Sequence, residues 1–177
     1  MTVSIPATLP LKPAASHPTI RLPMSSTRAQ VFTSRNHAIA EVIEGLVKKA
    51  ARTIDGAIYR FNNPRLAAAL GEALLRGVKV RVILDRTKYA ESQSSSRFPS
   101  EGTVPFRLLS GRPDAGGKMH HKFVVLDGKT LLTGSYNWTL ESEEQNFENL
   151  IVLRDRESIA WYQREFATLW AEAAPVE

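Results

Sequence analysis

Two hydrophobic periodicities alternate along the first half of the chain, and this alternation limits the folds open to it. Apolar residues recur at helical spacing in 39–50 and 66–74, which predicts two helices that each bury one face. Segments 29–33, 53–61 and 78–84 are instead short apolar runs of strand length. A strand–helix–strand–helix–strand order is typical of an α/β fold. We therefore expect a mixed, largely parallel sheet flanked by helices on both faces.

Local signals predict several element boundaries. Asn36 is a capping residue type before the first helix, and Asn62-Asn63-Pro64 predicts a turn followed by the start of the second. Gly77 predicts the end of that second helix. Asp127-Gly128 between two apolar runs predicts a hairpin that joins strands 119–126 and 130–134. The remaining elements are expected at 104–109 and 147–153 as strands and at 158–173 as a closing helix.

Composition divides the chain into a tail and one domain. Segment 1–28 is rich in Pro, Ala, Ser and Thr, and its prolines at 6, 10, 13, 18 and 23 forbid a continuous helix. The same prolines interrupt the apolar stretch that a secretory signal needs. We predict a flexible tail at 1–28 and a single domain at 29–177, with the cytoplasm slightly favoured over an exported location.

Charge and cysteine content exclude some function classes. The chain has no cysteine, which excludes disulfides, Cys-based zinc sites and thiol catalysis. Its formal charge of +5 favours polyanionic partners such as nucleic acid or anionic lipid, although a basic soluble protein without such a partner fits the charge equally well. No run of 18 apolar residues occurs, so no transmembrane helix and no integral membrane association are expected.

A long polar stretch, 86–102, follows the third predicted strand. We expect a loop of functional length there. Its cations Arg86, Lys88 and Arg97 are candidates either to line a substrate groove or to face solvent. Side chains expected to serve packing are Trp138, Trp161 and Trp170, and those expected in a solvated turn are Glu141, Glu143 and Glu144.

Polar residues between 118 and 149 are spaced in a way that packing alone does not explain. His120, Lys122 and Asp127 fit the pattern H-x-K-x4-D. On a strand, residues two apart project from the same face, so His120 and Lys122 point together and His121 points away. The imidazole can act as nucleophile or general acid, and Lys supplies a positive charge. The pair therefore indicates a phosphate site.

A second polar pair follows at the end of the next predicted strand. Ser135 and Asn137 are also two apart, within Gly134-Ser135-Tyr136-Asn137, and they offer neutral hydrogen bonds to the same phosphate. Asn137 could also cap the segment that follows it. Glu148 lies farther on, within Asn146-Phe147-Glu148-Asn149.

This combination resembles the phospholipase D superfamily, also called the HKD family. Segments 58–61 and 77–80 look like those of its small bacterial endonucleases, and segments 119–123 and 134–138 also look like its mitochondrial cardiolipin hydrolase branch. The similarity covers roughly 29–172 and implies the phospholipase D-like fold.

The resemblance also implies a mechanism. His120 would attack phosphorus and form a phosphohistidine, and the His120 of a second chain would protonate the leaving oxygen and later activate water. Lys122 and Asn137 would hold the non-bridging oxygens of the phosphate, and Ser135 would add a further hydrogen bond. Because the chain carries one H-x-K motif, the resemblance implies a homodimer with a composite active site.

Two further residues match the family pattern. Glu148 would accept a hydrogen bond from the far nitrogen of a His120 ring and fix its tautomer. Asp127 matches the motif, but a structural role in the turn after its strand is expected. Neither a metal nor a cofactor is required in this scheme, because Lys122 supplies the positive charge.

Three functions remain open at this stage. The first is an endonuclease with little sequence preference, acting on DNA, RNA or both. The second is a phospholipase D-type lipid hydrolase, for which Phe98, Pro99 and Phe106 could form an apolar rim. The third is a module that binds nucleic acid without cutting it, which the complete set of polar motif residues disfavours.

Overall fold

The computed structural model describes residues 29–94, 104–112 and 116–175. The predicted tail lies outside the described residues, as do Arg97, Phe98 and Pro99. In chain order the elements are β1 (Gln30–Thr33), α1 (Ile39–Lys49), β2 (Thr53–Ile58), α2 (Pro64–Leu75), β3 (Lys79–Asp85), α3 (Arg86–Ser94), β4 (Phe106–Leu109), β5 (Lys122–Leu126), β6 (Thr130–Gly134), α4 (Leu140–Glu144), β7 (Asn149–Leu153), α5 (Arg156–Glu172) and β8 (Ala174–Pro175).

The strands form one mixed sheet in the order β1-β7-β6-β5-β2-β3-β4-β8. The predicted α/β class is confirmed, but the expectation of a largely parallel sheet is wrong. Among the described strands, only the pairs β2–β3 and β3–β4 are parallel. β5 and β6 are antiparallel because the tight turn at Asp127-Gly128 can join strands only in that way. β1 and β8 extend the two edges with antiparallel pairs.

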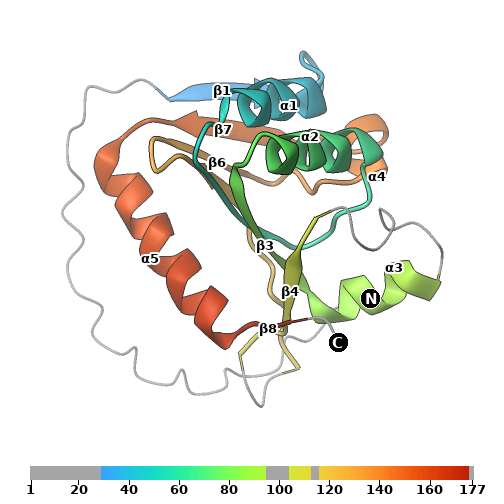
Figure 1. The fold of residues 1–177 in the computed structure, drawn as a ribbon. Coiled ribbons are helices and arrows are strands. Elements are labelled where there is room, and N and C mark those ends of the chain that lie inside the picture. The colour runs from blue at the N-terminus through green and yellow to red at the C-terminus, as the bar shows by residue number, and fades with distance from the viewer. Residues whose placement is uncertain (1–28, 95–103, 113–115, 176–177) are drawn as a thin grey trace, which may run out of the picture.

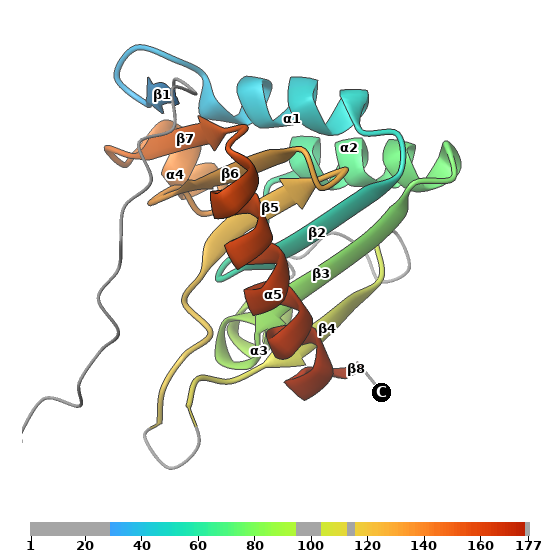
Figure 2. The ribbon, with the colours of Figure 1, turned by 90° about the vertical axis from the view of Figure 1, so that its left-hand side faces the viewer.

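Helices cover both faces of the sheet, as predicted. Figures 1 and 2 show α1 and α2 side by side on one face and α5 across the other. Alternation along β5 serves both layers, because Val124 packs toward α1 and α2 whereas Phe123 and Val125 pack toward α5. Phe123 and Phe166 are 1% exposed, and truncating either to Ala would cost about 3–5 kcal/mol of unfolding free energy.

The start of α2 follows the sequence signals. The Asn63 side chain accepts hydrogen bonds from the backbone N–H of Arg65 and Leu66, and Pro64 occupies the first helical turn. Gly77 has a φ of +81° directly after the helix, a conformation that favours glycine. Both predicted boundaries are confirmed.

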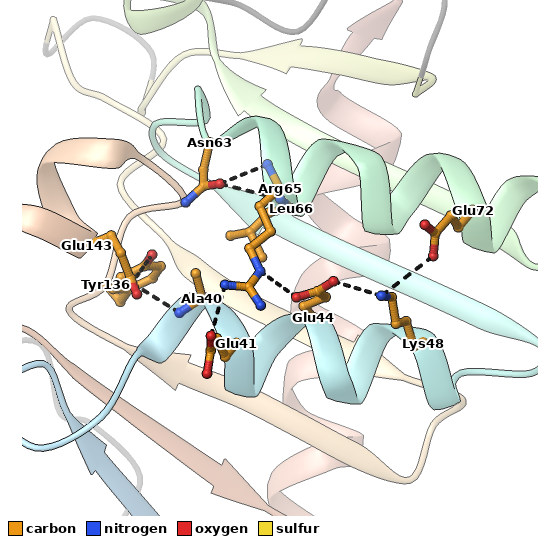
Figure 3. Close-up of polar contacts among 10 residues, drawn as sticks. All are labelled: Ala40, Glu41, Glu44, Lys48, Asn63, Arg65, Leu66, Glu72, Tyr136 and Glu143. Carbon is orange, nitrogen blue, oxygen red and sulfur yellow. Dashed lines mark hydrogen bonds and ion pairs between the residues drawn. The ribbon is translucent and has the colours of Figure 1, made fainter.

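The start of α1 does not follow them. Asn36 lies in a turn in which its N–H donates to Thr33 O at 3.0 Å. The N-cap is Ala38, which makes no side-chain capping bond. Glu143 of α4 replaces that bond, because its Oε2 accepts the N–H of Ala40 at 3.0 Å (Figure 3). The predicted Asn36 cap is therefore wrong, and a carboxylate from a distant helix caps α1 instead.

Glu143 is half-buried, and not part of a solvated turn as expected. Its carboxylate also accepts the Tyr136 hydroxyl at 2.8 Å (Figure 3). Burial and this carboxylate raise the pKa of Tyr136, so its hydroxyl stays a donor. Between α1 and α2, Arg65 pairs with Glu41 and Glu44 (Figure 3). These pairs are largely exposed and contribute little.

Two other expectations need correction. Segment 86–102 was expected to be a loop, yet 86–94 forms α3, because Asp85 Oδ1 accepts the N–H of Lys88 at 2.9 Å and caps the helix. Trp161 was expected to pack, yet it is 63% exposed. Trp138 is buried and Trp170 stacks on Phe166, as predicted. None of the helices in the described part of the chain is long and apolar enough to cross a bilayer.

Candidate active site

The polar motif residues gather where β2 and β6 end and where β5 and β7 begin. Ile58, the last residue of β2, lies opposite Lys122, the first of β5. Gly134, the last residue of β6, lies opposite Leu150, the second residue of β7. The antiparallel register therefore brings His120, Lys122, Ser135 and Glu148 to one end of the sheet.

His120 precedes the strand on which it was expected, because β5 begins at Lys122. Because His120 makes no strand hydrogen bonds among the described residues, two hydrogen bonds of the neighbouring residues fix its backbone. The N–H of Met119 donates to Asp85 Oδ2 at 2.9 Å, and His121 O accepts the N–H of Tyr59 at 2.8 Å. Asp85 is 1% exposed. The backbone of His120 is thus held between two buried groups.

The His120 ring and the Lys122 ammonium lie together, as the spacing predicted. Lys122 Nζ is 3.3 Å from His120 Nδ1 and donates to His120 O at 3.0 Å. Tyr59 supports both groups from below, with its ring centroid 4.2 Å from that of His120 and 4.7 Å from Lys122 Nζ. Aromatic rings attract a cation placed over their face, so Tyr59 stabilises the position of the ammonium.

The environment of His120 favours the neutral imidazole. Partial desolvation lowers its pKa first, and the positive charges of Lys122 and Lys118 lower it further, whereas Asp85 opposes them. A histidine with a lowered pKa keeps a free nitrogen lone pair near neutral pH, which is the form that attacks an electrophile. Burial also lowers the pKa of Lys122, and Glu148 opposes that shift.

Ser135 and Glu148 form a fixed pair beside this end of the sheet. The Ser135 hydroxyl donates to Glu148 Oε2, and it accepts the N–H of Asn149 at 3.1 Å. Ser142 Oγ donates to the other carboxylate oxygen at 3.0 Å. Ser135 therefore gives its proton to Glu148, and its expected bond to a phosphate would require that proton to turn away. Its clearest role in one chain is to position the carboxylate.

Glu148 does not bond the His120 of its own chain among the described residues. Its partners are Ser135, Ser142 and Asn146, the last with Nδ2 at 3.3 Å from Oε1. The predicted bond from a His120 ring to Glu148 is therefore not made within one chain.

Asn137 follows β6 and carries a buried polar atom with nothing to bond. Its Oδ1 is shielded from solvent and has no hydrogen-bond partner among the described residues. The neighbouring Trp138 is fixed, because its N–H donates to Arg60 O at 3.0 Å and its carbonyl accepts from Asn62. Thr139, and not Asn137, caps α4. The Asn137 oxygen is therefore an unsatisfied acceptor close to the residues at this end of the sheet.

The packing around Gly134 explains why the motif Gly134-Ser135-Tyr136-Asn137 begins with glycine. A Cβ atom at this position would lie 2.3 Å from Asn149 O. The backbones of β6 and β7 approach this closely just before Ser135 turns toward Glu148. Any larger residue would push the two strands apart.

Asp127 lies at the opposite end of β5 and is not brought to the site. Its Oδ1 accepts the N–H groups of Arg52 and Thr53 at 2.7 and 2.9 Å, and Oδ2 accepts that of Ala51 at 3.0 Å. Its φ of +54° shapes the turn before Gly128. These contacts fit the structural role expected for it and do not support the catalytic one.

His121 turns toward α5, away from Lys122. Its Nε2 lies 3.2 Å from Glu165 Oε1, and its ring meets Phe123 edge-on. Both His120 and His121 nevertheless line a cavity of about 610 Å³ that runs along α5. Lys88 lies elsewhere, in a small hollow beside Tyr59. In the described residues no group of three or more His, Asp or Glu side chains is placed to hold a metal ion.

Comparison with known proteins places this site in a family. A family model described as "Cardiolipin synthase, PLD-like domain" matches residues 43–170. The chain belongs to the phospholipase D superfamily. The given sequence carries the H-x-K motif once, and it spans about three fifths of the length of the curated relatives it matches.

Relatives and solved structures agree with this assignment. The chain is 38% identical over 130 residues to the mitochondrial cardiolipin hydrolase of Xenopus tropicalis, covering 73% of this chain and 60% of that protein. Two solved structures share the phospholipase D fold: Nuc of Salmonella typhimurium, with a TM-score of 0.74, 23% identity and coverage of 86% of this chain and 99% of that one, and NucT of Helicobacter pylori, with 0.73, 22%, 85% and 100%.

Two residues of this phospholipase D site were missed by sequence reasoning. Tyr59 lies in segment 53–61, for which the apolar pattern predicted only a strand, yet it lies just past the end of β2 and its ring supports that of His120. Asp85 was not singled out, although an acidic residue at the end of a buried strand is an unusual occupant of a core position. That signal was present in the sequence, whereas the contact of Tyr59 depends on a pairing between distant strands.

Proposed function

We propose that this chain is a phosphodiesterase that cleaves nucleic acid through a phosphohistidine at His120. The observation that carries the proposal is the His120 ring held 3.3 Å from the ammonium of Lys122, in surroundings that lower the pKa of the imidazole. The imidazole supplies the nucleophile, and the ammonium supplies positive charge where a phosphate would gain negative charge in the transition state.

The reaction divides into two displacements. In the first, a nitrogen of His120 bonds to phosphorus, the bond from phosphorus to the leaving oxygen breaks, and that oxygen takes a proton from an acid. In the second, water attacks phosphorus, its proton goes to the base, and the bond between phosphorus and nitrogen breaks. Lys122 and the Asn137 amide would bind the non-bridging oxygens throughout.

The acid and base is, in this proposal, the His120 of a second chain. The sequence contains one H-x-K motif, and one imidazole cannot attack and protonate at the same time. A two-fold axis beside the start of β5 would place two His120 rings in one site. The Glu148 carboxylate, fixed by Ser135 and Ser142, is suited to accept the second N–H of the ring that comes from the partner.

The charge of the chain favours nucleic acid as the substrate. The formal net charge is +5, and Lys118 and Lys122 flank His120 directly. Phosphate contacts would dominate binding, so the affinity should fall steeply as salt rises. One observation favours lipid as a second candidate: Phe147 is 82% exposed next to Glu148, and an exposed aromatic at the rim of a site can enter a bilayer interface.

One set of assays separates these candidates. Plasmid DNA, single-stranded DNA, RNA and labelled cardiolipin vesicles are each incubated with the full chain in EDTA, beside a His120→Ala control. The proposal expects cleavage of nucleic acid that survives EDTA and disappears in the variant. Turnover of cardiolipin alone would replace the nuclease with a lipid hydrolase. Binding of nucleic acid without any turnover would contradict catalysis altogether.

A further inference from the structure

A groove leads away from His120 along α5, and no step proposed above uses it. The cavity of about 610 Å³ begins at His120 and passes between the loop at Arg112 and the C-terminal half of α5. A second hollow of about 410 Å³ continues toward the N-terminal half of α5 and ends at Trp161. The two share His121, Glu165 and Thr168 as lining residues, so they adjoin along α5 at the 3.2 Å contact between His121 Nε2 and Glu165 Oε1; together they are called the α5 groove.

The α5 groove is long enough for a chain of several nucleotides. Its lining residues on the helix extend from Trp161 to Glu172, which at 1.5 Å per residue is about 16 Å. A single strand stacked at about 3.4 Å per nucleotide would place about five nucleotides over that length. A small phosphodiester bound at His120 would not reach the far end.

Trp161 at that far end does not pack into the core that the described residues form. It is 63% exposed, whereas Ile159 and Phe166 on the same helix are buried against the sheet. The guanidinium of Arg164 lies 4.3 Å from the centroid of its indole ring. An exposed indole beside a guanidinium is a surface on which a nucleobase can stack, whatever its identity.

Charge is divided between the two walls of the groove. Arg112 and Lys118 lie on the loop side near His120, whereas Glu165 and Glu172 lie on the helix side. The loop side suits phosphates. On the helix side, carboxylates can accept hydrogen bonds from the exocyclic amino groups of bases. Near His120 this wall presents two carboxylates, where a membrane-docking helix would present Lys and Arg to anionic headgroups; Arg164 lies only at the far end, beside Trp161.

We propose that the α5 groove binds a segment of single-stranded nucleic acid next to the scissile phosphate, with one base stacked on Trp161. The inference rests on the proposed function and adds to it the strandedness of the substrate. A duplex keeps its bases paired and stacked on one another, so only a single strand can present a base face to the indole.

The test compares a long substrate with a short one. For each full-length variant, kcat/KM is measured on a single-stranded 20-mer and on bis(p-nitrophenyl) phosphate, and the ratio of the two is taken. Trp161→Ala should lower this ratio at least about fivefold, mainly through KM, because a stacked base is lost. Trp161→Phe should stay close to wild type because phenylalanine still stacks. Leu75→Ala, which changes an exposed residue on α2, is the matched control. An unchanged ratio in Trp161→Ala would overturn the proposal that a base stacks on Trp161.

Fluorescence gives a second reading that needs no cleavage. The chain has three tryptophans, and Trp161 is the exposed one. In the non-cleaving His120→Ala background, the 20-mer should quench indole emission, and adding Trp161→Phe should abolish that quenching. If wild type cuts the small diester but no nucleic acid, the proposed function fails. If the 20-mer also causes no quenching, the proposal that the α5 groove binds a single strand fails as well. Selective loss of cardiolipin turnover in Trp161→Ala would assign Trp161 to a membrane and overturn the inference.

Discussion

The two ends of β5 differ in how fully their polar groups are hydrogen-bonded. At the end that carries His120, a half-buried ammonium lies against an imidazole, and Asn137 nearby in the fold keeps a buried oxygen without a partner among the described residues. At the other end, both carboxylate oxygens of Asp127 accept backbone N–H bonds. Unpaired buried polar groups lower stability, whereas satisfied ones support it. One short motif thus spans a reactive end and a stabilising end.

The largest effect is expected from Lys122→Met at the reactive end. Loss of the ammonium should lower kcat/KM for the diester by about 100- to 1000-fold, because a charge that stabilises the transition state is removed. The free energy of unfolding should stay the same or rise, since the change replaces a half-buried cation with an apolar chain of similar length. Initial rates and thermal unfolding measure both quantities. A large drop in stability would mean that Lys122 serves the fold, and would remove the contrast between the ends.

Gly134→Ala tests how far the reactive end depends on close backbone packing. The added Cβ would lie 2.3 Å from Asn149 O, so β6 and β7 must separate, at a cost of about 3 kcal/mol of unfolding free energy. Denaturant unfolding measures the loss. Gly45→Ala in α1 is the matched control, because a Cβ there meets nothing within 4 Å and should stabilise the helix by about 0.5–1 kcal/mol. Equal behaviour of the two variants would contradict the packing argument.

Asp127→Ala should have the inverse profile of the Lys122 variant. Three backbone hydrogen bonds are lost, which should lower the unfolding free energy by about 2 kcal/mol, while the folded protein keeps its turnover. Asp127→Asn should lose less, because asparagine retains an acceptor and tolerates a positive φ. If turnover falls while the unfolding free energy stays unchanged, Asp127 would have a catalytic role after all.

The same residue gives a pH test. Burial acts to raise the pKa of Asp127, but the N–H bonds from Ala51, Thr53 and Arg52 outweigh it and lower the pKa below its ordinary value. A carboxyl with a lowered folded-state pKa stabilises the protein above its unfolded pKa of about 4, and this stabilisation is lost as pH falls through the folded value. The stability difference between wild type and Asp127→Asn should therefore narrow below about pH 4.

The smallest effect is expected from Lys118→Met. Lys118 lowers the pKa of His120 together with Lys122, and Asp85 opposes both. Removing the Lys118 charge raises the pKa of His120, so the neutral form is lost at a higher pH. The acid limb of the kcat/KM profile should move toward higher pH by less than about one unit. A shift in the other direction would contradict the view that His120 must be neutral to act.

Local signals predicted much of the fold from the sequence. Helix α2 begins after Asn63 and ends before Gly77, as expected, and Asp127-Gly128 makes the hairpin turn. His120 and Lys122 meet as their spacing indicated, although the strand begins at Lys122, three residues later than expected. In each case the partners lie within a few residues of each other, so composition and spacing contain the answer.

Contacts between distant segments could not be predicted in the same way. The cap of α1 comes from Glu143, 103 residues from Ala40. Asp85 fixes Met119 across 34 residues. Trp161 looked like a core residue because it is aromatic and on a helix, but whether it is buried depends on which helix face meets the sheet. The sheet order also depends on such pairings, which is why its parallel part was overestimated.

A trapped covalent intermediate tests the role of His120 most directly. Single-stranded DNA with labelled internal phosphates is mixed with excess enzyme, quenched in alkaline denaturant within milliseconds to seconds, and the digested protein is examined by mass spectrometry. The proposed mechanism predicts that the peptide with His120 carries a DNA fragment joined through its terminal phosphate to the imidazole, an adduct that disappears in His120→Ala and as turnover proceeds. Sustained cleavage without an adduct at His120, or with an adduct on another residue, would contradict it.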